Sequence, residues 1–221
     1  KSIFESLDTS KMKIISMLDC VDAVEEEIVE GMQEEEEEEE GNEHEEEYDE
    51  HVWTSPKNAK IIAQKISDTL AEIDPANGGA YKNNTAAFLE SLDKLDSAFS
   101  EVVKNANRKT LVFGDRFPFR YFADAYGLKY FAAFPGCSTE TEASAATIAF
   151  LIDKVKAEKI PVVFHIELSN EDIAETICEA TGAEKLLLHA VHNITADDFK
   201  KGVTYIDLMT ANVSALKTAL N

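Results

Sequence analysis

The sequence predicts an α/β protein in which helices cover a parallel β-sheet, and three observations lead to this prediction. From Lys109 onward, short β-rich runs alternate four times with stretches of helical periodicity, which is the pattern of successive βα units. Two longer helical patterns precede them. The chain has 221 residues, of which 44% are hydrophobic and 29% charged. This ordinary globular balance excludes collagen-like, wholly disordered and disulfide-stapled proteins.

The first residues show only short elements. An amphipathic pattern at residues 3–7 predicts a short helix, and residues 13–18 form an apolar run of strand length. No apolar run approaches the roughly 20 residues of a membrane-spanning helix, and the opening residues lack the organisation of a signal peptide. Because the sequence opens at Lys1 inside a helical pattern, we expect a fragment whose natural N-terminus lies upstream.

The net charge of −22 is concentrated in residues 22–50, which hold 18 of the 43 acids and no Lys or Arg. Like charges at this density repel one another and leave no apolar face, so we expect a mobile, solvated loop. The rest of the chain carries 25 acids against 21 bases. Nucleic acid is not expected as a partner, because no basic stripe is present to release its counterions. A cationic ligand suits the charge better.

Two helices are predicted after the acidic segment. Thr54 or Ser55 can cap a helix that has Pro56 at its first position and ends near Asp74. The second follows between residues 80 and 107, which contain neither Pro nor Gly. At about 1.5 Å per residue it spans roughly 40 Å, which is longer than a small domain needs. We interpret it as a rigid strut between two lobes.

The four βα units make up the second half of the chain. We predict strands at residues 110–114, 128–134, 161–166 and 185–191, and helices at residues 117–126, 143–158, 171–181 and 203–220. In such sheets ligands bind at the carboxyl ends of the strands. The sequence contains no GxGxxG or P-loop, so a nucleotide fingerprint is absent.

Polar residues follow each predicted strand, as a ligand site at this edge requires. They are Asp115, Arg116, Cys137, Glu140, Glu142, His165, Glu167, His189 and His192. Imidazole and carboxylate groups together suit zinc or manganese. Other roles remain open for several of them. His165 can be a core residue, His189 a strand histidine with a backbone partner, and Cys137 a small buried hydrophobic residue. Asp115 can cap a helix, and Arg116 can pair with Glu140, Glu142 or Glu167.

Hydrolase and redox patterns are absent from the sequence. The three cysteines are far apart and form no CxxC pair, which excludes a zinc ribbon and a dithiol redox motif. No GxSxG elbow is present, and no histidine is marked as a companion of Cys137. A serine or cysteine hydrolase is therefore not predicted.

The stretch DEHVWTSPKNAKIIAQKISDTLAEIDP resembles the second-histidine motif of the metal-binding solute-binding proteins of zinc and manganese ABC importers. In that family an HxWxxP stretch opens a helix, and a long helix such as DPANGGAYKNNTAAFLESLDKLD links two lobes. The acidic segment also fits, since zinc-type members often carry a His- and acid-rich loop before this motif. The resemblance covers roughly residues 12–221 and implies a two-lobed α/β fold. Its N-terminal lobe (residues 1–75, with the acidic loop at 22–50) is incomplete, a linking helix covers 76–107, and a parallel βα lobe covers 108–221.

The resemblance implies that one metal ion is held between the lobes by four side-chain positions, of which the first lies upstream of Lys1. His51 matches the second position. At the third position FGDRFPFRYF is one residue longer than the family pattern, so either Asp115 or Arg116 is in register. We prefer Asp115 because only it can bind a cation. His192 matches the fourth position.

Two neighbours are expected to support these ligands. Glu167 of FHIEL matches a family glutamate beside the site, and we expect it to hold a ligand or Arg116. His192 stands where members have an aspartate, and nitrogen in place of oxygen favours zinc over manganese.

The implied function is capture of a divalent metal ion, zinc or alternatively manganese, and its delivery to the permease of an ABC importer. The resemblance implies a binding protein rather than an enzyme. It acts outside the cytoplasm, at the cell surface or in the periplasm, and is held at the membrane only through a lipid anchor that this chain lacks. Two rival hypotheses are a surface adhesion lipoprotein and an α/β metal-dependent hydrolase.

Overall fold

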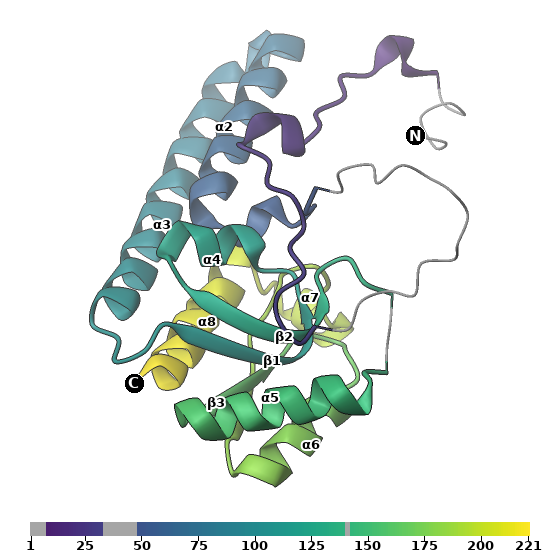
Figure 1. Ribbon diagram of the computed structural model, residues 1–221. Helices are drawn as coiled ribbons and strands as arrows, with labels where there is room; N and C mark the ends of the chain where they lie inside the picture. Colours follow the sequence, from purple (N-terminus) through teal and green to yellow (C-terminus); the bar gives the residue numbers. More distant parts are fainter. Residues whose placement is uncertain (1–7, 33–47, 140–141) are drawn as a thin grey trace.

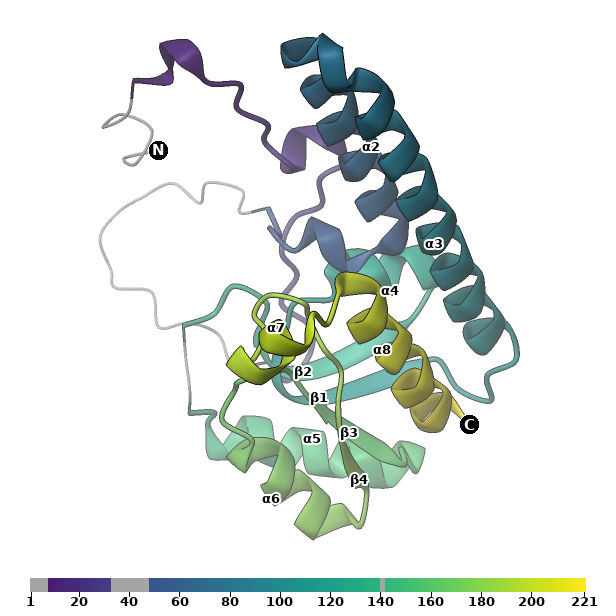
Figure 2. The same ribbon diagram turned by 180° about the vertical axis from the view of Figure 1, so that it is seen from behind.

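The computed structural model describes residues 8–32, 48–139 and 142–221. The helix predicted at residues 3–7 and residues 33–47 of the predicted acidic loop (22–50) lie outside them. The four strands are β1 (Thr110–Phe117), β2 (Lys129–Pro135), β3 (Val162–His165) and β4 (Glu184–Leu187). They form one parallel sheet in the order β2-β1-β3-β4 (Figures 1 and 2).

Two long helices stand beside this sheet and pack against each other. They are α2 (Pro56–Ile73) and α3 (Gly78–Lys104), joined by the short turn η4 (Pro75–Asn77). Proline at the start of α2 and of η4 sets both boundaries, because its ring fixes φ and removes a donor that the first helical turn does not need. The predicted α/β fold with a parallel sheet and a long helix is confirmed.

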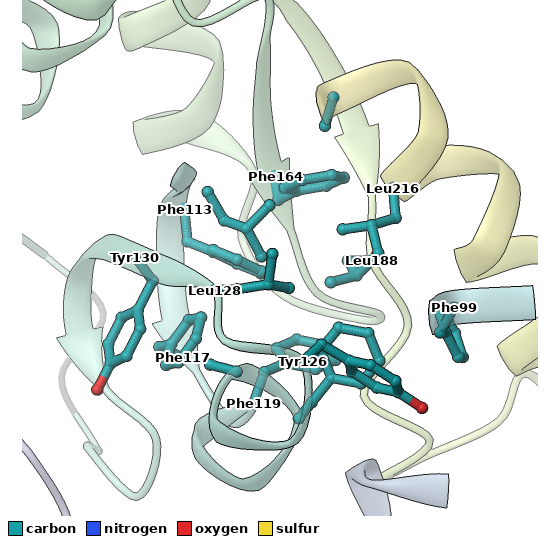
Figure 3. Close-up of a cluster of buried hydrophobic side chains, with 14 of the residues drawn as sticks. Phe99, Phe113, Phe117, Phe119, Tyr126, Leu128, Tyr130, Phe164, Leu188 and Leu216 are labelled. Atoms are coloured by element: carbon teal, nitrogen blue, oxygen red, sulfur yellow. The ribbon is translucent and has the colours of Figure 1, made fainter. Parts of the chain in front are cut away.

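Helices cover both faces of the sheet. The remaining helices are α4 (Arg120–Tyr126), α5 (Ala145–Glu158), α6 (Asp172–Thr181), α7 (Ala196–Lys201) and α8 (Tyr205–Leu220). Alternate residues of β1 face opposite cores: Leu111 and Phe113 join the cluster under α3, α4 and α8, whereas Val112 joins the cluster under α5 and α6. Figure 3 shows the first cluster, in which Phe113 lies between Phe117 and Phe164, with ring centroids 5.1 and 5.3 Å away.

Several boundaries differ from the prediction. Strand β1 continues to Phe117, so α4 begins three residues later than expected. Strand β4 ends at Leu187, before His189, and the short helix α7 was not predicted. Thr195 caps α7 by accepting a hydrogen bond from the Asp198 N–H, a signal that is visible in the sequence but too short to give a periodic pattern.

The start of the chain also differs from its sequence pattern. Of residues 13–18, which were predicted as a strand-length run, residues 13–17 are irregular and Leu18 begins the 3-10 turn η2 (Leu18–Cys20). The described ends of the acidic segment pack on the body: Met32 is buried, and Glu25 pairs with Tyr48 in an antiparallel bridge. The acidic segment is thus anchored at both ends. Within the described residues, no helix is long and apolar enough to cross a membrane.

Candidate metal centre

The turn that carries His51 lies against the carboxyl edge of the sheet. His51 precedes the 3-10 turn η3 (Val52–Thr54), which leads into α2. The loop after β2 approaches it closely, since a Cβ atom on Gly136 would lie 3.3 Å from His51 Cε1. Residues from the first half of the chain and from a strand end therefore share one site, as the strand-end rule predicts.

His51 and His192 approach one another in this site, although 141 positions separate them. Their ring centroids are 5.7 Å apart and the rings are perpendicular. The expected approach of these two histidines is confirmed. His51 is buried, with 5% of its surface exposed, whereas His192 is exposed. One imidazole is thus enclosed by the protein, and the other faces solvent.

Trp53 joins the two histidines. Its ring centroid lies 5.5 Å from that of His51 and 5.8 Å from that of His192. Its indole N–H donates to the Ala190 carbonyl at 2.9 Å, and its own carbonyl accepts from the Tyr205 hydroxyl at 2.9 Å. These bonds connect η3 to the loop after β4 and to α8. Trp53 was not among the predicted site residues, although it is the tryptophan of the HxWxxP motif that contains His51.

Asp49 is the direct partner of the His51 ring. Its carboxylate oxygen Oδ1 accepts from the His51 backbone N–H at 2.8 Å and lies 3.2 Å from the ring nitrogen Nδ1. The contact leaves Nε2 as the nitrogen that is free to bind a metal. Sequence reasoning placed Asp49 in the solvated loop, but it is 1% exposed. The sequence feature that could have identified Asp49 as a site residue is its position two residues before His51.

Glu167 holds the loop that presents His192. One carboxylate oxygen accepts from the backbone N–H groups of His192 and Asn193 at 2.8 and 3.1 Å, and the other accepts from the Ala190 N–H at 2.7 Å. Val191, between them, has a φ of 57°, an unusual value for a β-branched residue. These three bonds hold the loop in this conformation.

His189 lies beside this carboxylate and is buried. Its Nδ1 accepts from the Val191 N–H at 2.9 Å and lies 3.5 Å from Glu167 Oε2. Burial lowers the pKa of His189, although the nearby Glu167 charge opposes the shift. His189 is therefore a neutral histidine with a backbone partner.

Asp115 stands at an irregularity in β1. Phe113 pairs with Ala132 and Arg116 with Phe134, so two residues of β1 oppose one residue of β2, as in a β-bulge. The bulge lies where the sequence is one residue longer than the family pattern. The Asp115 carboxylate accepts from the backbone N–H groups of Arg116 (2.8 Å) and Ile166 (3.0 Å) and from the Ser169 hydroxyl.

Glu167 was expected to hold either a ligand or Arg116, and Arg116 is not its partner. Its guanidinium donates to the Ser138 carbonyl at 3.2 Å, which ties β1 to the loop after β2. Glu140 lies outside the described residues. Arg116 therefore holds the loop next to His51 through a backbone oxygen.

The three predicted ligands are only partly brought together. His51 and His192 meet, whereas the oxygens of Asp115 are engaged by three donors. Across residues 8–32, 48–139 and 142–221, no three His, Cys, Asp or Glu side chains lie together so that they could hold a metal ion. Burial and the nearby Glu26 raise the pKa of the Cys137 thiol to about 12, which disfavours a thiolate ligand there.

The comparisons with known proteins match this architecture. The model of the family ZnuA, described as zinc-uptake complex component A periplasmic, matches residues 3–219. The chain belongs to this family. A relative in the ZnuA family, the zinc-binding lipoprotein AdcA of Streptococcus pneumoniae, is 35% identical over 171 residues. The match covers 77% of this chain and 34% of AdcA, so the chain spans about a third of that relative.

Solved structures of ZnuA-like proteins share the fold. The Zn(II)-bound ZnuA-like domain of Streptococcus pneumoniae AdcA has a TM-score of 0.67 at 34% identity, covering 78% of this chain and 64% of that domain. The laminin-binding protein Lbp of Streptococcus pyogenes has a TM-score of 0.68 at 27% identity, covering 79% of this chain and 65% of that one. The expected resemblance to metal-binding solute-binding proteins is confirmed.

Proposed function

We propose that the chain captures a zinc ion between His51 and His192. The observation that supports this proposal most directly is the distance of 5.7 Å between their ring centroids. Two imidazoles that bind one zinc ion through nitrogens at about 2.0 Å have centroids about 5 Å apart in tetrahedral geometry. The two rings therefore need only a small adjustment to share an ion.

The other coordination positions are filled by water or by an oxygen ligand, since zinc prefers four ligands. We propose Asp115 as the oxygen ligand. Its carboxylate must release the Ser169 hydroxyl to turn toward an ion. Two imidazole nitrogens favour zinc over manganese, because nitrogen donors suit the softer cation.

Zinc capture fits a solute-binding protein that serves an ABC importer outside the cytoplasm. The family description, a periplasmic zinc-uptake component, supports this role. Ligands from the turn before α2 and from the loop after β4 come from different halves of the chain, so the ion can hold the halves together until the permease separates them. The name of the relative AdcA, a zinc-binding lipoprotein, supports attachment to the membrane through a lipid anchor. The proposed role of the chain is to bind and release the ion, and it includes no catalytic step.

Calorimetric zinc titration tests the assignment. His51→Ala and His192→Ala should each weaken the tightest site by more than about 100-fold, because each removes a direct ligand. His165→Ala is the matched control: this half-buried histidine lies at the end of β3, where its Nδ1 contacts the Ile166 carbonyl at 3.1 Å, and zinc affinity should not change. If both site variants bind like the wild type, zinc binds elsewhere and the proposal is wrong.

Adhesion is a second candidate function, favoured by the likeness to the laminin-binding protein Lbp. Immobilised laminin should retain the chain, in zinc and after chelation alike, if adhesion is independent of the metal site. Absence of retention in both conditions would remove this candidate.

A further inference from the structure

We propose that Asp49 is the positioning residue of the zinc site: it holds the His51 ring with its proton on Nδ1 and its free nitrogen, Nε2, toward His192. The inference rests on the proposed function and adds a residue that acts through His51. Its basis is the contact of Asp49 Oδ1 with both the backbone N–H and the ring Nδ1 of His51, at 2.8 and 3.2 Å.

Asp49 is itself fixed from two other parts of the chain. Its backbone N–H donates to the Val24 carbonyl at 3.0 Å, and its carbonyl accepts from the Tyr121 hydroxyl at 2.8 Å. The same hydroxyl accepts from the Val24 N–H at 3.2 Å. Asp49 therefore sits in a small network that joins the acidic segment to α4. Because these bonds hold the backbone of Asp49 and its side chain is buried, the carboxylate has little freedom to leave the ring.

The loop after β2 closes the other side of the pair. A Cβ atom on Gly136 would lie 3.3 Å from Asp49 Oδ2 and 3.3 Å from His51 Cε1, and 3.0 Å from the Phe117 carbonyl. Only a residue without a side chain fits here without displacing its neighbours. The carboxylate and the imidazole are thus held together against backbone, and ring rotation away from Asp49 is restricted.

The chemistry of a metal ligand explains why this arrangement is useful. A neutral imidazole has one N–H donor and one nitrogen lone pair, and the partner of the donor decides which nitrogen is left for the metal. A carboxylate on Nδ1 selects the Nε2 lone pair and makes it more basic. Because the ring is oriented before the ion arrives, less conformational entropy is lost on binding.

The tautomer can be measured without metal. With ¹⁵N-labelled histidine in the zinc-free chain, the two ring nitrogens of His51 give separate signals, which His51→Gln identifies by their loss. We expect the proton on Nδ1 in the wild type. In Asp49→Ala the preference should be lost, and in Asp49→Asn, whose amide oxygen still accepts, it should be largely retained. A proton found on Nε2 in the wild type would overturn the inference.

Zinc titrations of the same variants give the second measurement. Affinity should fall by about 10- to 100-fold in Asp49→Ala and by less in Asp49→Asn, as for other residues that orient a metal ligand. Asp49→Asn keeps the acceptor of the His51 backbone N–H, so it remains informative if Asp49→Ala fails to fold. Glu25→Gln is the charge-matched control: Glu25 is an exposed acid whose backbone pairs with Tyr48, and this variant should bind zinc like the wild type.

The two proposals fail in different ways. If His51→Ala binds zinc normally, the site is elsewhere and both the proposed function and the role of Asp49 are wrong. If His51→Ala loses binding but Asp49→Ala retains wild-type affinity, only the positioning role is wrong.

Discussion

Glu167 shows how one buried carboxylate sets the path of a loop. Its side chain is 6% exposed and accepts three backbone N–H groups from the segment that carries His192. Hydrogen bonds to an ionised acceptor are stronger than neutral ones, and a buried donor left without a partner is costly. The position of His192, the exposed proposed ligand, therefore depends on Glu167, which is not itself one of the proposed ligands.

We expect Glu167→Gln to lower the free energy of unfolding by about 2–3 kcal/mol, because an amide offers only one oxygen and turns its NH2 group toward a backbone donor. Urea unfolding of the zinc-free chain measures this. Glu171→Gln is the control: its side chain is 44% exposed and pairs with Lys185 on the surface, so its effect should stay below about 1 kcal/mol. Equal effects of the two variants would contradict the role of Glu167.

His189 predicts a pH dependence of stability. Burial lowers its pKa, so the folded protein keeps it neutral while the unfolded chain takes up a proton near pH 6.5. This contribution is complete above about pH 6.5 and is lost as the pH falls toward the lowered pKa of the folded state. Urea unfolding with a chelator present, from neutral to mildly acidic pH, should show a shallower fall for His189→Gln than for the wild type. Parallel curves would mean that His189 is not the group responsible.

At the scale of elements, the packing of α6 on β1 depends on Gly114. A Cβ atom there would lie 2.5 Å from Ala174 Cα and 2.6 Å from Ala174 N, so the backbone of α6 itself blocks a side chain. Gly114→Ala should lower the free energy of unfolding by about 1–3 kcal/mol or more, because α6 must move off the sheet. Thermal unfolding checks it against Gly79→Ala in α3, where nothing lies within 4 Å of the added atom. The control should unfold at or above the wild-type temperature.

The elements that the sequence predicted well are those with long periodic patterns. α2 and α3 carry regular apolar spacing and a proline at or near their start, and both begin within two residues of the prediction. The start of α4 was predicted three residues too early. The local pattern does not show that β1, with its bulge at Gly114 and Asp115, continues as far as Phe117. His51 and His192 were found through family motifs. Asp49, Trp53 and Gly136 act through contacts between segments far apart in sequence, which periodicity does not report.

At the scale of the whole molecule, the acidic segment combines a charged middle with anchored ends. Residues 34–47 contain eleven acids, and no apolar anchor occurs among them. We expect replacement of these residues by a Gly/Ser stretch of equal length to leave the thermal midpoint nearly unchanged, or slightly higher at low salt, because self-repulsion is removed. Calorimetry would measure it, and a drop of many degrees would mean that the segment packs on the body.

The same replacement separates two roles of the acidic segment. If it only solubilises the protein, zinc titrations of the replaced chain should match the wild type throughout. If it collects cations near the site, the wild type should show additional weak zinc binding that the replaced chain lacks, while the tight site remains in both. Loss of the tight site would contradict the assignment to His51 and His192.

The position of Trp53 makes it an intrinsic fluorescent probe of the proposed site. It is the single tryptophan of the chain, and its ring lies within 6 Å of both histidine rings. Indole emission excited apart from tyrosine therefore originates beside the proposed zinc site and nowhere else in the protein. An ion that draws the two imidazoles together would change the surroundings of that one fluorophore, so emission from the unlabelled protein measures occupancy of the proposed site, in a cuvette or a stopped-flow cell.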